Sequence, residues 1–389
     1  TEQGYSFMSE TDTEIAANLV EHLYRSNRED GPEAAIREAL SLISGAFALG
    51  IIFADHPDTL YAVRKDSPLI IGAGRGENFI ASDVPAILKH TRDVYRLGER
   101  ELAILTKDGV TVINSYGERV NCVYEHIDWD ASAAEKCGYP HFMIKEIMEQ
   151  PEAIAKTIAP RISNGRIELG FKHITAEMLK KVNSIKIIGC GSAYHVGFVA
   201  GYFMRAALRI PVESVLASEF RYDDPIVDEN TLAIVISQSG ETLDTLYGLR
   251  EAKKHGAKTI AIVNVVGSTI ANESEDVLYT WAGPEIAVAT TKAYSTQLIA
   301  AYCLALQFAY VRGEMELSEY ERLLSELETI PEKIEKILED KERLQWFAAK
   351  VANSKDIFFI GRGIDYAVSL EGSLKLKEIS YIHSEAYAA

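Results

Sequence analysis

The chain has 389 residues, of which 47% are hydrophobic, and a formal net charge of −17. This length is enough for two or three domains with real hydrophobic cores. The acidic balance argues against general binding to nucleic acid or to membrane surfaces, because both favour a basic face. No run in the sequence approaches the roughly 20 apolar residues that a membrane-spanning helix needs.

Cysteine usage indicates a reduced, cytoplasmic protein. The four cysteines, Cys122, Cys137, Cys190 and Cys303, form no CxxC pair and lack the spacing of metal ligands. We therefore expect no structural disulfide and no metal site. Cys190 follows a predicted strand beside Gly191, where a small buried residue is a better interpretation than a nucleophile. The first residue is not an initiator methionine, so we expect the true start of the protein to be missing.

Residues 1–128 form a first region in which helices precede strands. Amphipathic patterns predict helices at 12–24 and 32–43. Strands are predicted at 46–53, 60–65, 69–72, 78–82, 102–106 and 110–114, with turns at 56–58 and 107–109. This order predicts an antiparallel meander beside helices. The glycine-rich segment 72–76 looks like a nucleotide-binding turn, but no helix follows it, so a hairpin turn is the better interpretation.

After a linker predicted at 129–142, the pattern changes to alternating strands and helices. Strands are predicted at 185–188, 232–237 and 259–263, and helices near 194–208, 241–255 and 291–311. Such alternation is typical of a parallel sheet with helices on both faces. Residues 317–349 read as one continuous helix. Its apolar stripe consists of Leu323, Leu327, Ile330, Ile334, Ile337 and Leu338, and its charged side is a solvated face.

Two segments of the second region resemble one another. Residues 187–194 and 358–366 each combine a strand, a Gly-x-Gly turn and a helix start. This similarity predicts a structural repeat. A doubly wound domain needs on the order of 100 residues, and far fewer follow the second strand. We therefore expect the second copy to be cut at its C-terminal end.

A hydroxyl-rich turn follows the predicted strand 232–237. It contains Ser237, Gln238, Ser239, Gly240, Glu241 and Thr242, and a helical pattern begins directly after it. Free backbone N–H groups and the positive end of the helix dipole suit a phosphate at such a place. The hydroxyls would hold phosphate oxygens without adding charge, and the glycine lets the backbone approach closely. A plain helix-capping motif is the alternative.

Other residues that could take part in chemistry lie on the helix predicted after the second Gly-x-Gly turn. Glu371, Lys375 and Glu378 are spaced so that they share one helix face. They are either an exposed ladder of ion pairs or an acid–base group, in which Lys375 neutralises an anion and Glu378 moves a proton beside a carbonyl. His195 and His383 have no visible partner, and we interpret both as packed or surface histidines.

A second loop, residues 285–292, precedes a long predicted helix. It is rich in small side chains and hydroxyls, and this composition makes it another candidate for ligand binding. Thr290 or Thr291 acting as a simple N-cap is the alternative interpretation.

These residues together resemble one family, the isomerising glutamine–fructose-6-phosphate aminotransferases, also called glucosamine-6-phosphate synthases. The matching segments are 9–14, 139–142, 145–147, 149–151, 217–222, 237–242 and 371–383. They cover essentially the whole chain in the right order. Single motifs are shared with other sugar-isomerase (SIS) domains, whereas the combination with Ser-Glu-Thr-Asp-Thr-Glu at 9–14 is specific.

The resemblance implies an α/β fold class, with a partial N-terminal-nucleophile (αββα) glutaminase domain followed by SIS-type doubly wound parallel-sheet domains. Residues 1–128 would be the C-terminal part of the glutaminase domain and 143–316 the first SIS domain. Residues 317–389 would be connecting helices and the truncated start of a second SIS domain. The family implies a homodimer, with glutamine and fructose 6-phosphate as substrates and with no cofactor or metal. The product, glucosamine 6-phosphate, feeds amino-sugar (UDP-N-acetylglucosamine) synthesis.

The resemblance also assigns roles to residues. Asp12 would hold the α-amino group of glutamine. The sugar phosphate would be bound by Ser192, Ser237, Gln238, Ser239 and Thr242, and Val288 would line the site. Lys375 and Glu378 would sit at the reacting end, with Glu378 moving the proton between C1 and C2.

The chain departs from the family pattern at both ends and at one internal position. The family's nucleophilic cysteine would precede residue 1, and its ring-opening histidine and Schiff-base lysine would follow Ala389. Ala193 stands where many members have serine, and a backbone N–H is expected to be able to serve there. We therefore expect that a polypeptide of these residues alone cannot use glutamine. The alternatives are a sugar-phosphate-binding SIS regulator and a deglycase.

Overall fold

The computed structural model describes residues 4–127 and 135–389. The chain divides into two compact units, residues 1–131 and 132–389, and each is described by itself. The linker predicted at 129–142 falls partly on residues 128–134, which lie outside the described residues. Within the described ranges, the chain contains no helix that is both long and apolar enough to cross a lipid bilayer.

In the first unit, two helices cover a four-stranded antiparallel sheet. Helices α1 (Asp12–Ser26), η1 (Arg28–Asp30) and α2 (Gly31–Leu42) precede the strands β1 (Phe47–Phe53), β2 (His56–Lys65), β6 (Leu102–Thr106) and β7 (Gly109–Ile113). The strand order is β1-β2-β6-β7. Val20 and Ile36 from the helices are buried with Val63 and Leu102 from the sheet. Both predicted helices are therefore confirmed, and their apolar stripes cover the sheet.

A second antiparallel sheet shares an apolar layer with the first. It contains β3 (Ile70–Ala73), β4 (Asn78–Ala81), β5 (Asp93–Arg96) and β8 (Glu125–His126) in the order β4-β3-β5-β8. Ala62 and Leu105 of the first sheet are buried with Ile71 and Leu97 from the region of the second. The glycine-rich segment 72–76 lies in the hairpin between β3 and β4, which confirms the interpretation as a turn.

Two expectations for this unit are wrong in detail. The strands form two sheets and not one meander, and the short polar strands β5 and β8 were not predicted. The turn predicted at 56–58 is part of β2, where His56 already pairs with Phe53. The pairing is irregular between Ile52 and Phe53, and proline is tolerated beside such irregularities at a strand start. Pro57 therefore does not end the strand.

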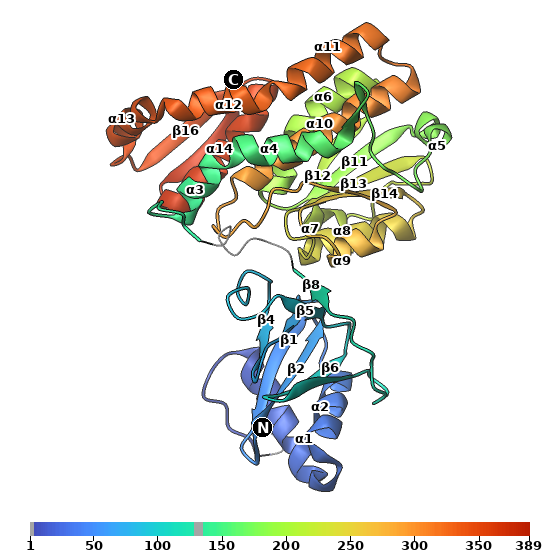
Figure 1. Cartoon of the computed structure of the whole chain (residues 1–389), viewed down its shortest axis with the longest axis vertical. Coiled ribbons are helices and arrows are strands. Elements are labelled where there is room, and N and C mark those ends of the chain that lie inside the picture. The colour runs from blue at the N-terminus through green and yellow to red at the C-terminus, as the bar shows by residue number, and fades with distance from the viewer. Residues whose placement is uncertain (1–3, 128–134) are drawn as a thin grey trace. The chain divides into compact units, whose positions relative to one another are not determined.

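The second unit is built on a five-stranded parallel sheet, as the strand–helix alternation predicted (Figure 1). Its strands are β11 (Ser184–Gly189), β12 (Val212–Leu216), β13 (Thr231–Ser237), β14 (Lys258–Val263) and β15 (Asp276–Tyr279), in the order β12-β11-β13-β14-β15. Strand β13 is buried along its whole length. The edge strands β12 and β15 were not predicted, because they are short and contain polar residues.

Helices cover both faces of this sheet (Figure 1). One face packs against α5 (Ala176–Lys181), α6 (Ser192–Leu208) and α10 (Lys292–Arg312). The other packs against α7 (Ala217–Phe220), α8 (Leu243–Lys254) and α9 (Thr269–Glu273). In β13, Ile234 faces the first core and Val235 faces the second. This burial on both sides explains why the central strands read as unbroken apolar runs.

A further layer of helices lies over α10. It includes α3 (Phe142–Met148), α4 (Gln150–Ile158), the short η3 (Ala159–Arg161) and the small hairpin of β9 (Ile162–Ser163) and β10 (Arg166–Ile167). Ile154 of α4 and Leu324 of α11 (Leu317–Glu328) are buried with Cys303 and Leu306 of α10. Helix α10 is therefore enclosed by apolar neighbours on more than one side.

The continuous helix predicted at 317–349 is in fact three helices. Helix α11 is followed by α12 (Ile330–Glu339) and α13 (Lys341–Val351). Pro331 lies in the first turn of α12, where its missing N–H is tolerated although it would break a helix interior. The chain leaves the helical conformation again at Asp340. Apolar periodicity alone did not reveal these breaks.

The predicted structural repeat is present as a repeat of backbone geometry. Strand β16 (Asp356–Gly361), helix α14 (Ile364–Ser380) and the parallel strand β17 (His383–Ala388) repeat the arrangement of β11, α6 and β12. Gly191 has φ 55° and ψ −129°, and Gly363 has φ 57° and ψ −125°. Both helices contain 17 residues and end at a left-handed residue, Arg209 or Tyr381. The two segments therefore have nearly the same backbone conformation.

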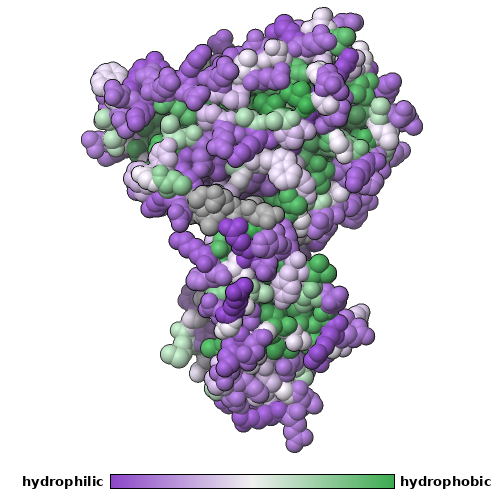
Figure 2. Space-filling model, in the orientation of Figure 1, coloured by the Kyte–Doolittle hydropathy of each residue, from purple (hydrophilic) through white to green (hydrophobic). Residues whose placement is uncertain are grey.

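The surface in view is predominantly polar. Figure 2 shows hydrophilic residues over most of this face, with smaller hydrophobic patches between them. This distribution agrees with a chain in which 57 acidic residues outnumber 40 basic ones. An anion bound by this protein must therefore rely on local dipoles and on a few placed cations.

Candidate functional site

The hydroxyl-rich turn lies at the topological switch point of the parallel sheet. From β11 the chain passes to β12 on one side, and from β13 it passes to β14 on the other. The crevice between the carboxyl ends of β11 and β13 is where ligands usually bind in such sheets. Ser192 directly follows the turn after β11, and Ser237 ends β13. The two predicted phosphate-binding segments therefore border the same crevice.

The hydroxyls of this turn also stabilise the turn itself. Ser237 Oγ accepts a hydrogen bond from Gly240 N at 3.0 Å and lies 2.8 Å from Thr242 Oγ1. Ser239 Oγ accepts from Glu241 N at 3.1 Å. Gly240 has φ +68°, and a Cβ added there would lie 2.0 Å from Ser268 Oγ, so only glycine fits this position. The local bonds preorganise the turn and are compatible with ligand binding.

A cavity of about 250 Å³ brings together the residues that the sequence singled out. It is lined by Ser192, Ser237, Gln238, Ser239, Thr242, Val288, Lys375 and Glu378, together with Cys190, Ala193, Ile236, Thr290 and Gln297. The hydroxyls come from two strand ends, whereas the lysine and the glutamate come from α14. One hollow thus combines anion-binding groups with a candidate acid–base pair.

The charged face of α14 is a ladder of ion pairs that is only partly exposed. The Lys375 ammonium pairs with the Glu378 carboxylate, and its Nζ lies 3.5 Å from Glu371 Oε1. The Lys375 side chain is 18% exposed and that of Glu378 is 39% exposed, while Glu371 is buried. The ion pairs that the alternative interpretation predicted are therefore present. Glu378 is exposed at the cavity wall, whereas Lys375 is largely covered.

Glu371 joins the two repeats, which the sequence did not reveal. Its carboxylate accepts a hydrogen bond from Ser192 Oγ at 2.7 Å and lies 2.8 Å from His195 Nδ1. His195, for which the sequence showed no partner, is thus a mostly buried histidine paired with Glu371. His383 also has a partner, because its Nδ1 lies 2.8 Å from Asp356 Oδ1 on the paired strand. Neither contact could be read from spacing, since the partners are distant in sequence.

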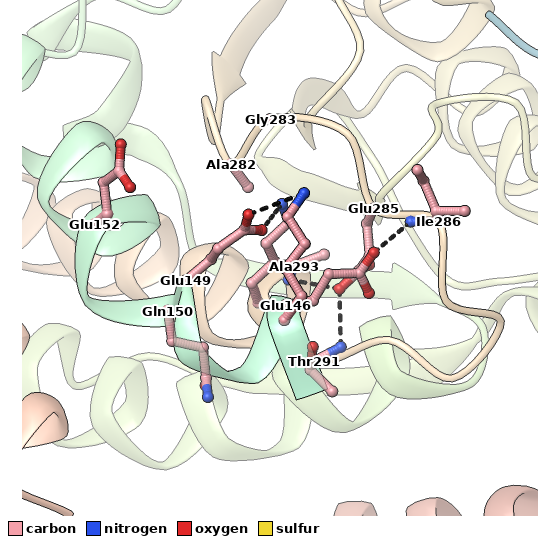
Figure 3. A network of polar contacts seen from close by, with 12 residues as sticks. Glu146, Glu149, Gln150, Glu152, Ala282, Gly283, Glu285, Ile286, Thr291 and Ala293 are labelled. Atoms are coloured by element: carbon pink, nitrogen blue, oxygen red, sulfur yellow. Dashed lines mark hydrogen bonds and ion pairs between the residues drawn. The ribbon is translucent and has the colours of Figure 1, made fainter. Parts of the chain in front are cut away.

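The loop before α10 is capped by a carboxylate. Glu285 accepts hydrogen bonds from Thr291 N at 2.8 Å, Ala293 N at 3.1 Å and Thr290 Oγ1 at 2.5 Å (Figure 3). Thr291 occupies the N-cap position of α10, as the alternative interpretation expected, but its side chain makes no capping hydrogen bond. Because Glu285 carries the capping role, Thr290 remains at the cavity wall, next to the fully exposed Val288.

Cys190 and Ala193, which lie at the turn after β11, are small residues with structural contacts. Burial raises the pKa of the Cys190 thiol, which disfavours the thiolate that a nucleophile needs. This agrees with the interpretation of Cys190 as a packed residue. Ala193 lines the cavity, but its N–H donates to Cys190 O at 3.2 Å. The backbone N–H expected to replace a missing hydroxyl at Ala193 is therefore already engaged.

Asp12, the predicted glutamine-binding residue, lies in the first unit. It is the first residue of α1 and is exposed. Its neighbour Glu14 accepts hydrogen bonds from Met8 N at 2.8 Å and Ser9 N at 2.7 Å. These bonds fold residues 8–14 into the start of the helix. They leave the Asp12 carboxylate at the positive end of the helix dipole.

The structure offers no assembled metal centre within residues 4–127 and 135–389. No group of three or more histidine, cysteine, aspartate or glutamate side chains in these ranges could hold a metal ion. The polar groups that line the cavity include hydroxyls, amide side chains and the Lys375–Glu378 pair.

Comparison with protein families and with curated proteins shows which proteins this chain is similar to. The SIS domain family matches residues 178–307 and 350–389, which include both strand–turn–helix units. Glutamine–fructose-6-phosphate aminotransferase (isomerizing) from Clostridium tetani (strain Massachusetts / E88) is 54% identical over 390 residues, covering 100% of this chain and 64% of its own length. The protein of the same name from Methanosarcina mazei is 47% identical over 396 residues, again covering 100% and 64%. The chain thus spans just under two thirds of these relatives.

A solved structure agrees with this placement. It is described as the C-terminal domain of glucosamine-fructose-6-phosphate aminotransferase from Francisella tularensis, and it matches with a TM-score of 0.63 and 38% identity. The match covers 65% of this chain and 71% of that chain. Its extent agrees with an α/β, parallel-sheet SIS fold in the second unit. The chain therefore belongs to the family of isomerising glutamine–fructose-6-phosphate aminotransferases.

Proposed function

We propose that this chain is part of an enzyme that transfers the amide nitrogen of glutamine to fructose 6-phosphate and isomerises the product to glucosamine 6-phosphate. The observation that carries the proposal is the cavity where the hydroxyl turn meets Lys375 and Glu378. An acyclic hexose phosphate needs an anion site at one end and a proton-transfer group at the other. Both kinds of group line this one hollow.

The phosphate would be held mainly by dipoles and hydroxyls. Ser237, Gln238, Ser239 and Thr242 surround the N-terminus of α8, and Ser192 lies at the N-terminus of α6. Free N–H groups at such helix ends favour an anion. This chemistry suits a chain with net charge −17, because it needs no cluster of cations in an acidic protein.

Proton transfer would be the task of Glu378. Its carboxylate would take the proton from C1 of the aminated sugar as the C1=C2 bond forms, the C2=N electrons move to nitrogen and the nitrogen gains a proton. It would then return the proton to C2 as the C1 hydroxyl loses its proton and C1=O forms, so that the proton lost at O1 balances the one gained at nitrogen. Lys375, which pairs with Glu378, would balance negative charge that develops at the reacting end. A positioned general base of this kind typically contributes a rate factor of about 10² to 10⁴.

The first unit would supply the glutamine side of the reaction. Its helix layer and two antiparallel sheets support assignment of residues 1–128 to the C-terminal part of a glutaminase domain of the αββα class. Asp12 would bind the glutamine ammonium. Residues 143–316 would be the first SIS domain and 317–389 the connecting helices and the start of the second, in a cytoplasmic homodimer that needs no cofactor.

The test is formation of glucosamine 6-phosphate by the complete gene product, with either glutamine or ammonia as nitrogen donor. We expect glutamine-dependent product that is lost in Glu378→Gln, while fructose 6-phosphate still binds. Absence of product with both donors would contradict the proposal, and binding without turnover would favour a SIS-type regulator.

A further inference from the structure

One side of the cavity is formed by a loop that needs external support. This cavity loop, residues 281–291, connects β15 to α10 and brings Val288 and Thr290 to the cavity wall. The Val288 side chain is fully exposed, so apolar packing does not fix the tip of the loop. Its position therefore depends on polar contacts to its backbone.

Glu285 within the loop supplies part of these contacts, and Asn264 holds the start of the loop through Ala282 N and Gly283 O. Glu146 supplies the contacts nearest to Val288, from outside the loop. Glu146 Oε1 accepts hydrogen bonds from Ile286 N at 2.6 Å and Ala287 N at 3.2 Å, and Oε2 lies 3.3 Å from Ala287 N (Figure 3). These two N–H groups directly precede Val288. The carboxylate thus forms hydrogen bonds with the backbone at the point where the loop turns towards the cavity.

Glu146 is an unusual residue to bury. It is only 2% exposed, and burial raises its pKa, with Glu285 adding to that rise while the two backbone N–H groups and Lys292 oppose it. A buried carboxylate is costly unless it is paired, and well-packed apolar residues often stabilise a fold as well or better. Fold stability alone therefore gives little reason for a glutamate at this position, whereas holding two loop N–H groups does.

The helix that carries Glu146 is itself tied to the start of α10. Lys292 Nζ donates to Glu149 Oε2 at 2.7 Å, and Lys145 Nζ lies 3.2 Å from Glu149 Oε1. Ser295 Oγ donates to Gln150 Oε1 at 2.5 Å. Lys145, Glu149 and Gln150 belong to the segments 145–147 and 149–151, which matched the family pattern although none of the three lines the cavity. The geometry gives this motif a physical task, which is to anchor the cavity loop.

We propose that Glu146 is a positioning residue for the sugar site, holding the cavity loop so that Val288 and Thr290 face the bound sugar phosphate. This role rests on the proposed function, since it assumes that the cavity binds a sugar phosphate. Glu146 touches neither the substrate nor the Lys375–Glu378 pair. It acts through the backbone of Ile286 and Ala287.

The matched variants are Glu146→Gln and Glu152→Gln, which make the same chemical change on neighbouring helices. Glu152 lies on α4, its side chain is 68% exposed, and it pairs with Lys156. Figure 3 shows Glu152 apart from the contacts that hold the loop. Glu146 Oε1 accepts from both loop N–H groups. Glu146→Gln therefore removes the negative charge from this acceptor and replaces the Oε2 contact with Ala287 N by an NH₂ group, which is itself a donor.

Two readouts on the 389-residue chain test the proposal. Hydrogen exchange of the peptide containing Ile286 and Ala287 is expected to speed up about 10-fold or more in Glu146→Gln and to stay unchanged in Glu152→Gln. The Kd for fructose 6-phosphate, measured by calorimetry, is expected to rise about 10-fold in Glu146→Gln only. Circular dichroism melting confirms that both variants fold. If Glu146→Gln does not fold, the same two readouts are made on Glu146→Asp, which keeps the charge but shortens the reach.

The possible results separate the two proposals. Unchanged loop exchange and unchanged affinity in the Glu146 variant would overturn the positioning role while leaving the proposed function intact. A wild-type chain that does not bind fructose 6-phosphate would overturn the proposed function, and the role of Glu146 with it. Faster loop exchange with unaltered affinity would show that the loop is anchored but irrelevant to the sugar, which also overturns the role.

Discussion

The two strand–turn–helix repeats of the second unit share a backbone but divide the chemistry between them. In the first repeat, Ser192 follows the Gly-x-Gly turn, and α6 continues with buried apolar residues such as Val199. In the second, Ile364 takes the place of Ser192, and α14 carries Glu371, Lys375 and Glu378 along one face. The fold thus supplies two equivalent scaffolds, and the proposed function gives anion binding to the side chains of one and proton transfer to those of the other.

The largest expected effect concerns the chemistry of the second repeat. Glu378→Gln removes the proposed base but keeps the size of the side chain. We expect kcat for sugar isomerisation by the complete gene product to fall about 10² to 10⁴-fold, with the Kd for fructose 6-phosphate changing much less. Rate and affinity falling together would indicate that Glu378 binds the substrate and does not move its proton.

The next effect concerns the contact between the repeats. Glu371→Ala removes the acceptor of Ser192 and the partner of His195, and it leaves buried polar groups without one. We expect a loss of about 2–4 kcal/mol in the free energy of unfolding, measured by denaturant titration. Lys377→Ala on the same helix removes only an exposed pair with Glu385 and is expected to cost less than about 1 kcal/mol. Equal losses in the two variants would mean that the contact between the repeats stabilises the fold no more than an exposed ion pair does.

A smaller effect separates the two helix starts. Ser192→Ala deletes a cavity hydroxyl, and we expect the Kd for fructose 6-phosphate to rise about 5- to 10-fold, which is what one hydrogen bond contributes. The matched change Ile364→Ala, at the corresponding position of the second repeat, is expected to leave this Kd unaltered. A similar weakening in both variants would argue that the two turns are alike in function as well as in backbone.

An effect of similar size tests the likeness of the two backbones. A Cβ added at Gly191 or at Gly363 would meet open space, with nothing among the described residues within 4 Å. The cost of Gly191→Ala or Gly363→Ala therefore comes from positive φ alone, which we expect to be about 1–2 kcal/mol at each. Thermal melts of the two variants should shift by similar amounts. A clear inequality would show that the turns differ in a way that the backbone angles do not reveal.

The elements that could be predicted are those whose signal lies in neighbouring residues. The central strands β11, β13 and β14 are buried on both faces and read as apolar runs, and the hydroxyl turn follows one of them directly. The edge strands β12 and β15 were missed because an edge strand has fewer apolar neighbours and includes polar residues such as Glu213 and Asp276. Short length and polar residues together therefore hid these two strands.

The same distinction applies to the candidate site. Lys375 and Glu378 share a helix face, so their pairing was visible in the spacing. The bonds of Glu371 to Ser192, and of Glu146 to Ile286, join segments more than 100 residues apart. Such contacts depend on how helices pack, which periodicity does not encode. Groups that would touch the substrate could be predicted, but the residues that hold them in place could not.

The most direct test of the central claim is a crystal structure of the 389-residue chain with fructose 6-phosphate. We predict that the phosphate lies at the turn of Ser237, Ser239 and Thr242, with the C1 end of the sugar next to Glu378. A phosphate found elsewhere, or a sugar whose C1 end points away from Glu378, would contradict the account of this cavity as the site of sugar binding and proton transfer.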